Sequence, residues 1–320
     1  MGATTARLTR SRGRGDRVLS GLTGGAGLAV LVLIVAIAVF LTDRAIPALR
    51  ADTTNFLTTR IWNPDETPAT FGVLATSFGT ILTSALALLI AGPLAVGIAL
   101  YVSEYAPVRL ARPLGSLIDL LAAIPSVVYG LWGLNFLVPY SGKFQGWLAA
   151  HLGFIPLFSL GKGGVVGRSI FIASIVLAIM ILPIIAAVTR EVFLQVPRPA
   201  KEAALALGAT KLEMIRYAVL PHSRSGITGA LMLGLGRALG ETIAVALVLS
   251  LSSNTSFHIL NANDGGNTIA ANIAAQYQAA EPTGQAALIA SGLVLFVITF
   301  AVNAVARVVV ARGNRRVAGR

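Results

Sequence analysis

The amino-acid sequence predicts an all-α integral membrane protein with six transmembrane helices. The 320-residue chain is 55% hydrophobic but only 12% charged, whereas a soluble globular domain carries about 25% charged residues. Its apolar residues gather into six long runs that can each cross a bilayer as a helix. Its lysines and arginines lie mainly in alternate segments between those runs. Together these observations are typical of a polytopic membrane protein.

A basic tail begins the chain. Residues 1–23 are rich in arginine and are followed by an uncharged run over residues 24–41. A cleaved signal peptide also combines a basic stretch with an apolar run. The run here is longer than the usual signal core and no clear A-x-A cleavage site follows it, so we favour a first transmembrane helix. We expect residues 1–23 to form a cytoplasmic tail and residues 24–320 to form the membrane domain.

Five further apolar runs follow the first. They comprise residues 67–103, 114–138, 169–189, 225–251 and 286–306. About 20 helical residues cross the hydrocarbon core of a bilayer, and a helix satisfies its own backbone hydrogen bonds where no water is present. We therefore interpret each run as one transmembrane helix, which places both termini on the same side of the membrane.

The distribution of basic residues predicts the orientation of these helices. Most of the 25 lysines and arginines lie in the segments 1–23, 104–113, 190–224 and 307–320. By contrast, the connecting segment 252–285 has none. Cytoplasmic segments of membrane proteins are enriched in Lys and Arg, so we expect the N- and C-termini and the 190–224 loop to be cytoplasmic.

Two segments expected on the outer side have distinctive compositions. Residues 147–160, within the segment 139–168, are largely apolar and are interrupted by His151. They are too few to span a bilayer, so we expect an interfacial or docking helix there. Residues 252–285 are rich in Asn, Thr and Gly, which favours an exposed loop that is open to a partner.

The cytoplasmic loop contains a helix–turn–helix pattern. Its markers are Glu202, Ala203, Ala204, Gly208, Leu220 and Pro221. Gly208 can adopt the left-handed conformation that ends a helix, and Pro221 is expected to mark the end of this segment before the fifth run. The small alanines would let a partner's groove close around the first helix. An amphipathic loop lying on lipid head groups explains the composition equally well.

Two opposite charges, Arg237 and Glu241, lie near the middle of the fifth run. Residues four apart share one helix face, and charges at this depth face a bundle interior or water. An arginine fork remains protonated and suits phosphate oxygens, while a carboxylate could accept a hydrogen bond from a protonated phosphate. We therefore favour a substrate-pathway role. The alternative is that the pair neutralises itself and fixes helix packing.

Gly236 and Gly240 frame the arginine in a G-x-x-x-G pattern. Such spacing favours close packing of membrane helices. A dinucleotide-binding loop is excluded because the glycines lie inside an apolar run and the third glycine falls one residue late.

Several kinds of chemistry lack the residues they need. The chain has no cysteine, which excludes disulfides and thiol nucleophiles, and its three histidines lie far apart without metal-ligand spacing. No phosphate-cradling P-loop occurs, because residues 161–163 lack the final hydroxyl. The net charge of +12 comes from loops beside apolar runs, so we expect membrane lipid and no nucleic acid as a partner.

The cytoplasmic loop contains residues whose spacing resembles the motif of a known family. The E-A-A-x3-G spacing from Glu202 to Gly208, followed by Leu220-Pro221, resembles the coupling motif of bacterial ABC importer permeases. In that family the segment sits in a cleft of an ATP-binding subunit, which assigns ATPase coupling to Glu202, Ala203, Ala204, Gly208, Leu220 and Pro221. Ala218 departs from the motif, because a larger aliphatic residue is usual there.

Two further motifs resemble those of phosphate-specific ABC importer permeases. Residues 123–133 read A-I-P-S-V-V-Y-G-L-W-G, and residues 235–242 read L-G-R-A-L-G-E-T. The Y-G-L-W form and the long 139–168 segment are more similar to PstC-type than to PstA-type subunits. The resemblance covers about residues 72–306 and leaves the basic tail outside.

The resemblance implies a type I ABC importer permease that brings inorganic phosphate across a bacterial plasma (inner) membrane. Its implied partners are a PstA-type permease, two PstB-type ATP-binding subunits that carry ATP and Mg, and an extracytoplasmic PstS-type phosphate-binding protein. No cofactor, metal or enzymatic activity is expected on this chain.

Two alternative functions remain open at this stage. One is an ABC permease for another oxyanion, such as phosphonate, sulfate or molybdate. The other is an ion-coupled secondary carrier, which would leave the segment from Glu202 to Pro221 unexplained. A membrane enzyme is the weakest reading, because no nucleophile–base or metal constellation is evident.

Overall fold

The chain is almost entirely helical in the computed structural model, which describes residues 14–160, 164, 166–249, 258–262 and 266–318. The α-helices are α1 (Arg14–Ala51), α2 (Leu74–Leu100), α3 (Val108–Ala122), α4 (Ser126–Trp132), α5 (Val138–Leu152), α6 (Ile170–Leu194), α7 (Arg198–Ala206), α8 (Lys211–Met214), α9 (Leu220–Leu239), α10 (Ile243–Val248), α11 (Ile269–Gln276) and α12 (Pro282–Ala318). Shorter π-helical segments comprise Tyr101–Tyr105, Gly133–Leu137 and Ile215–Val219, and a 3-10 turn comprises Pro156–Phe158. A two-residue antiparallel ribbon pairs β1 (Trp62–Asn63) with β2 (Thr70–Phe71).

Long apolar helices confirm the predicted class of membrane protein. Among the described residues, four helical stretches are long and apolar enough to cross a bilayer, namely Val18–Ala51, Leu74–Tyr105, Ile170–Leu194 and Pro282–Val308. The pair α3 and α4–α5 passes the same test only if both halves are counted as one bent span. The other two predicted runs are therefore not simple straight helices.

Helix α6 forms the centre of the bundle and packs against α2, α3 and α9. Its fully buried side chains include Ile172, Leu177, Met180, Ile181 and Ile185. Glycines on α9 allow its close approach to α6, because a Cβ added at Gly234 would lie 2.5 Å from Cδ1 of Ile185. A helix that is apolar on all sides is expected at such a central position in a membrane protein.

The third apolar run is bent, contrary to the single helix predicted for residues 114–138. Helix α3 ends at Ala122, and the helical stretch from Ser126 to Leu152 turns by 87° from it. Pro125 explains the break because it has no backbone N–H and disfavours helical geometry at the residue before it. The bend separates a vertical half of the run from a half that leaves the bundle sideways.

The prediction of one helix over residues 225–251 is wrong. A continuous helical stretch begins at Lys211, passes through the π-helical segment Ile215–Val219 and stops at Leu239. Helix α10 then starts at Ile243, after a three-residue break, and residues 250–251 lie outside the described part of the chain. Gly240, at the end of α9, has a weak helix propensity that favours this break.

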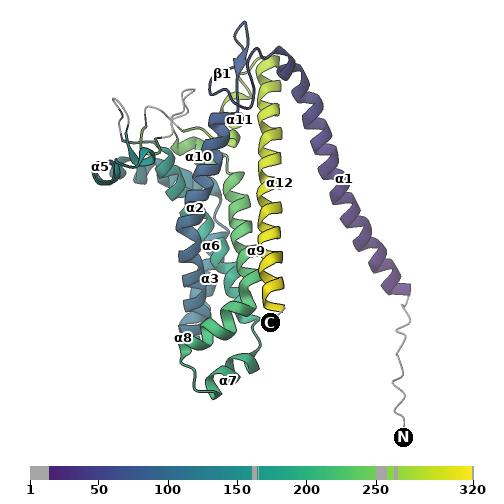
Figure 1. Cartoon of the computed structure of the whole chain (residues 1–320), viewed down its shortest axis with the longest axis vertical. Helices are drawn as coiled ribbons and strands as arrows, with labels where there is room; N and C mark the ends of the chain where they lie inside the picture. Colours follow the sequence, from purple (N-terminus) through teal and green to yellow (C-terminus); the bar gives the residue numbers. More distant parts are fainter. Residues whose placement is uncertain (1–13, 161–163, 165, 250–257, 263–265, 319–320) are drawn as a thin grey trace.

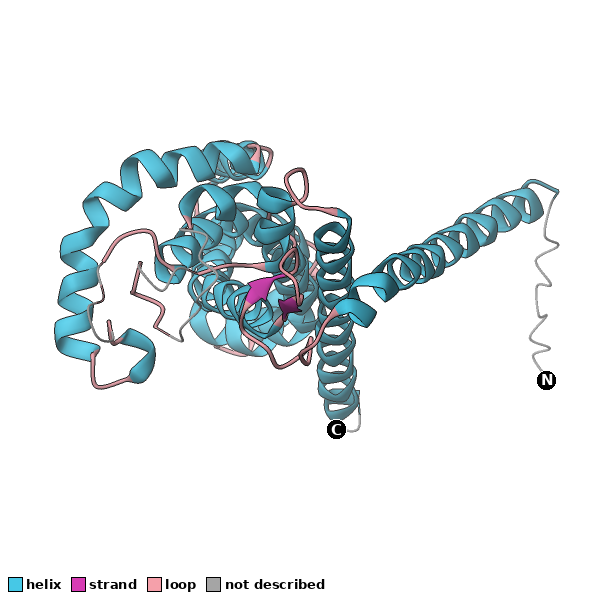
Figure 2. Cartoon of the chain, turned by 90° about the horizontal axis from the view of Figure 1, so that it is seen from above, coloured by secondary structure: helices cyan, strands magenta, loops and turns pink. Residues whose placement is uncertain are grey.

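The connecting segments lie at two opposite ends of the bundle (Figure 1). Helices α7 and α8 lie at the lower end together with the end of α12, whereas β1 and α11 lie at the upper end. Helix α1 slants away from the other helices in both views (Figures 1 and 2), and its main contact is with α12. This arrangement agrees with the predicted alternation of the connecting segments between the two sides.

Candidate functional site

Arg237 and Glu241 lie on either side of the end of α9. Arg237 is half-buried in the last turn of that helix, whereas Glu241 falls in the break before α10. Glu241 is only 8% exposed, and its Oε1 accepts a hydrogen bond of 3.1 Å from the backbone N–H of Ala244. The expected common helix face is therefore wrong, because the helix ends between the two residues.

The guanidinium of Arg237 is free of a carboxylate partner among the described residues, since no ion pair within 4.0 Å includes it there. A cation in the last turn of a helix is stabilised by the partial negative charge of the unpaired carbonyls. That placement offsets part of the cost of a half-buried charge and leaves several N–H donors available. Mutual neutralisation by Glu241, the alternative considered from the sequence, has no ion pair to support it.

The motif over residues 123–133 meets the fifth apolar run at this site. Helix α4 packs directly against α10, and a Cβ added at Gly130 would lie 2.7 Å from Cα of Ala244. The hydroxyl of Tyr129 in α4 donates a hydrogen bond of 3.0 Å to the carbonyl of Leu121. The structure thus places the motif over residues 123–133 against α10, the helix that directly follows the motif over residues 235–242.

Arg168 holds the opposite end of α10, and sequence reasoning missed this role. Its guanidinium donates hydrogen bonds to the carbonyls of Leu247 (2.6 Å), Val248 (3.3 Å) and Leu249 (2.8 Å). The last carbonyls of a helix have no partners within the helix, and a cation there also favours the helix dipole. Glu241 and Arg168 therefore cap the two ends of this six-residue helix.

Gly236 and Gly240 do not pack helices together within this chain, contrary to the expectation from their spacing. Nothing in the described chain lies within 4 Å of a Cβ added at Gly236, and the nearest atom to one at Gly240 is the Gly236 carbonyl oxygen at 3.7 Å. The close contacts of α9 with α6 are made by Gly226 and Gly234 instead. Both glycines beside Arg237 are therefore exposed in the described part of the chain.

The predicted helix–turn–helix of the lower loop is present. Helix α7 contains Glu202, Ala203 and Ala204, and Gly208 adopts the left-handed conformation with φ of +85°. Thr210 then begins α8 through a capping box in which its hydroxyl and the side chain of Glu213 bond each other's backbone N–H groups. The backbone N–H and the hydroxyl of Thr210 both donate to the Glu213 carboxylate and lower the pKa of Glu213 below its usual range. The T-x-x-E spacing in the sequence is the signal for this cap.

Leu220 and Pro221 occupy the first turn of α9 instead of ending the segment. The helix continues across them because a π-helical segment, Ile215–Val219, comes directly before Leu220. Such a segment changes the hydrogen-bond register, so the missing N–H of the proline can be tolerated inside a continuous helical stretch. Pro221 therefore joins the loop to the bundle instead of separating them.

One surface of this loop is available to a partner. Glu202 and Ala203 are exposed, while Ala204 packs against a buried cluster that includes Phe193 and Met214. Leu207 is 89% exposed. Exposed apolar and small side chains beside a rigid turn are typical of a protein–protein contact.

Two contacts fix this loop to the lower end of α2. Nζ of Lys201 lies 2.5 Å from Oε1 of Glu104, whose side chain is only 7% exposed. Nζ of Lys211 lies 4.6 Å from the centre of the Tyr105 ring, within cation–π range. Because Glu104 and Tyr105 belong to the π-helical segment that ends α2, movement of the loop can pass directly to that helix.

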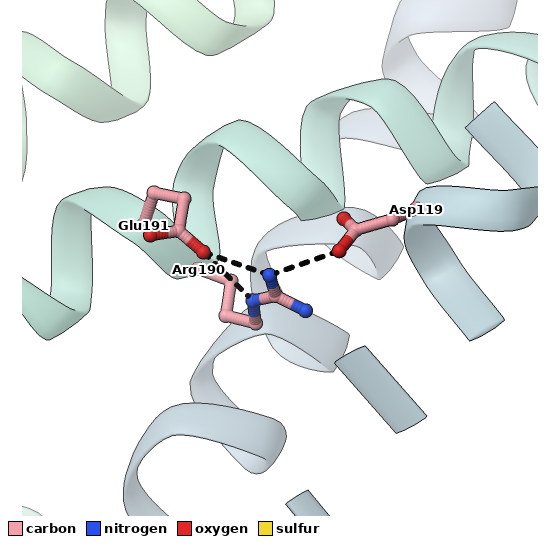
Figure 3. Close-up of polar contacts among 3 residues, drawn as sticks. All are labelled: Asp119, Arg190 and Glu191. Atoms are coloured by element: carbon pink, nitrogen blue, oxygen red, sulfur yellow. Dashed lines mark hydrogen bonds and ion pairs between the residues drawn. The ribbon is translucent and has the colours of Figure 1, made fainter. Parts of the chain in front are cut away.

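A third contact joins α3 to α6 near the same end (Figure 3). The guanidinium of Arg190 lies 3.3 Å from Asp119 of α3 and 2.7 Å from its neighbour Glu191. Gly115 provides the space, because a Cβ added there would overlap the Arg190 guanidinium. The lower ends of the helices are thus joined by charged contacts, whereas their middles pack through apolar side chains.

Metal chemistry has no obvious site in the described part of the chain. No group of three or more His, Cys, Asp or Glu side chains could hold a metal ion there. The candidate site is therefore defined by one cation, one buried carboxylate, the C-terminal end of α9 and the short helix α10.

The chain is similar to known transport proteins. Residues 91–315 match the family described as "Binding-protein-dependent transport system inner membrane component". The chain belongs to this family.

Its relatives include proteins with a more specific description. The "Phosphate transport system permease protein PstC 2" of Mycobacterium tuberculosis is 46% identical over 299 residues, which cover 92% of each chain. The PstC protein of Xylella fastidiosa is 43% identical over 289 residues, which cover 90% of this chain and 88% of that one.

Solved structures support the fold. A bacterial ABC transporter involved in import of the acidic polysaccharide alginate matches with a TM-score of 0.54 and 18% identity, covering 91% of this chain and 98% of that one. The inward-facing MetNI methionine ABC transporter matches with a TM-score of 0.50 and 16% identity, covering 74% and 95% of the two chains. The predicted all-α architecture of an ABC importer permease is confirmed.

Proposed function

We propose that this chain is the membrane-spanning permease subunit of an ATP-driven importer of inorganic phosphate. The observation that carries the proposal is Arg237, a half-buried cation without a carboxylate partner in the described structure, at the end of α9. Similarity to proteins described as phosphate transport system permeases supports the choice of substrate.

The two charged residues would act on different parts of the anion. The planar fork of Arg237 matches two oxygens of a phosphate and keeps its charge at all physiological pH values. The buried carboxylate of Glu241 has a second oxygen that can accept a hydrogen bond from the hydroxyl of a protonated phosphate. A sulfate dianion has no such proton at neutral pH, so the same carboxylate would repel it.

ATP would be hydrolysed on separate subunits. We assign their contact to the cytoplasmic loop, with Glu202, Ala203, Ala204 and Gly208 forming the contacted turn and Leu220 and Pro221 joining it to α9. A second, related permease would complete the pathway, and an extracytoplasmic binding protein would deliver phosphate to the opposite end. ATP-driven closure of the two ATP-binding subunits would shift the population of inward- and outward-open states.

Competition for uptake tests the substrate. Cells that depend on this importer are given radiolabelled phosphate with an excess of unlabelled phosphate, phosphonate, sulfate or molybdate. Unlabelled phosphate is expected to suppress uptake of the label, whereas sulfate and molybdate are not, because they carry no proton to donate to Glu241 at neutral pH. A phosphonate keeps such a proton but has carbon in place of one oxygen, so its effect shows whether all four oxygens are needed. Equal suppression by sulfate or molybdate would assign the importer to a broader class of oxyanions.

A further inference from the structure

Helix α5 carries its polar face inward. Gln145 is 0% exposed, and its amide donates to the hydroxyl of Ser141 (2.8 Å) and the carbonyl of Gly167 (3.1 Å). Its amide oxygen accepts from the hydroxyl of Ser169 at 3.0 Å. The polar groups on this face are therefore satisfied by the protein itself, which is the reverse of a surface helix in water.

The outward face is aromatic. We use the name aromatic ridge for Trp132, Phe136, Tyr140, Phe144 and Trp147. Their exposure ranges from 41% for Trp132 to 74% for Tyr140. Rings contact one another within two groups, with centroid separations of 6.3 Å for Trp132–Phe136, 5.3 Å for Phe136–Tyr140 and 6.3 Å for Phe144–Trp147. An exposed aromatic surface of this size would be costly in water.

The ridge lies across the direction of the membrane-spanning helices. The helical stretch from Ser126 to Leu152 is bent by 87° from α3. Figure 1 places α5 at the side of the bundle, well above α7, and Figure 2 shows a helix curving around that rim. Helix α5 has 15 residues, about 22 Å, and is the last part of the stretch from Ser126 to Leu152, so the bend of that stretch, and not its length, indicates its sideways course.

We propose that the aromatic ridge binds the membrane–water interface at the end of the bundle opposite α7, with α5 lying flat in the bilayer plane. Trp and Tyr are enriched at this depth, since their rings enter the acyl region while the N–H and O–H groups remain hydrated. Lys143, exposed between Tyr140 and Phe144, would meet lipid phosphates. In the orientation predicted from the basic residues, this is the outer leaflet.

The lipid contact has a structural consequence for the candidate site. Helix α4 continues through Gly133–Leu137 into α5, so anchoring the ridge also fixes the depth of α4. Helix α4 in turn packs against α10 through Gly130. The interface would therefore hold one wall of the site at a constant level. The inference requires a membrane protein but is independent of the transported substrate.

Site-directed spin labelling tests the proposal directly, because the chain has no native cysteine. Tyr140→Cys and Trp147→Cys are labelled separately in the full transporter, whose other subunits have been made cysteine-free. Depth is measured from the relative accessibility to oxygen and to a water-soluble nickel chelate. Val35→Cys on α1 and Glu66→Cys in the β1–β2 connection serve as references for a long apolar helix and for an extramembrane loop.

Both ridge labels are expected at the head-group level and at the same depth. A spanning helix would instead separate them by about 10 Å, from seven residues at 1.5 Å each. Three results would overturn the proposal: a depth difference of that size, accessibility to the nickel chelate equal to the Glu66 position, or protection from both reagents, which would mean that protein covers the ridge. Phe144→Cys provides a second position if one variant fails to assemble.

Discussion

Arg237 illustrates how a charge can be kept at a half-buried position without an ion pair. It lies in the last turn of α9, where the unpaired carbonyls of the helix end favour a cation. Within the described structure no carboxylate neutralises it, while Glu241 uses one oxygen to cap the next helix. The two residues thus have separate structural roles, and both retain capacity for an anion.

Replacement of Arg237 is the residue-scale prediction. Arg237→Gln should reduce phosphate uptake by about 10- to 100-fold, since hydrogen bonds to charged groups contribute about 1.5–3 kcal/mol each. Phosphate uptake by Arg237→Lys should lie between that of the unaltered chain and that of Arg237→Gln, because lysine keeps the charge but lacks the planar fork. Uptake of labelled phosphate is compared at equal amounts of assembled transporter. Arg109→Gln, at an exposed position of α3, is the control, and undiminished uptake by Arg237→Gln would remove this residue from the pathway.

The roles of residues that stand out from their neighbours in the sequence could be predicted. The roles of residues whose partners are distant in the sequence could not. Arg237 and Glu241 stand out because charges are rare inside apolar runs, and Gly208 stands out because it follows a short helical pattern. Arg168 was counted only as a loop charge, since its partners are backbone carbonyls about 80 residues away. Backbone acceptors have no sequence signature.

At the scale of elements, hydropathy locates apolar runs but does not show where their helices break. The run over residues 225–251 contains a break around Glu241 because that side chain begins a new helix at Ile243. The break in the third run had a visible signal in Pro125. Within the described part of this chain Gly236 and Gly240 do not meet a neighbouring helix, since spacing alone does not show which face of a helix meets its neighbour.

Close packing of α4 against α10 gives the first element-scale prediction. Gly130→Ala should lower the thermal stability of the purified transporter and reduce uptake, because the new Cβ would lie 2.7 Å from Cα of Ala244 and overpacking costs about 1–3 kcal/mol. Gly97→Ala is the matched control, since nothing in the described chain lies within 4 Å of its added Cβ. Equal melting temperatures for the two variants would contradict the proposed packing.

The contact between α7 and the end of α2 gives the second element-scale prediction. Lys201→Ala leaves the enclosed carboxylate of Glu104 unpaired, a cost of about 1–3 kcal/mol, and should weaken the link that transmits movement. We expect fewer phosphate ions transported per ATP hydrolysed, with ATP hydrolysis itself retained. The double swap Lys201→Glu with Glu104→Lys should restore the ratio. A normal ratio in Lys201→Ala would show that this ion pair does not transmit the movement.

At the scale of the whole molecule, the all-α membrane fold could be predicted from composition and apolar runs. In lipid few structures other than helices can satisfy the hydrogen bonds of the backbone. The sequence predicted an interfacial or docking helix over residues 147–160, but α5 comprises Val138–Leu152. Its bounds could not be predicted, since its inward polar face is satisfied by Ser169 and Gly167 in another segment. Helix α1 remains outside the bundle and contacts mainly α12. A long apolar helix in that position has room for lipid or for a second subunit beside it.

The central claim is that this chain forms the membrane pathway for phosphate, while ATP hydrolysis on separate subunits supplies the energy for transport. The most direct test is phosphate uptake by proteoliposomes that contain the transporter with its ATP-binding subunits, compared with proteoliposomes from which those subunits have been removed. We predict uptake that requires both ATP and those subunits and that is lost when either is withheld. Undiminished, concentrative uptake by the stripped membranes, driven by an ion gradient, would contradict the account.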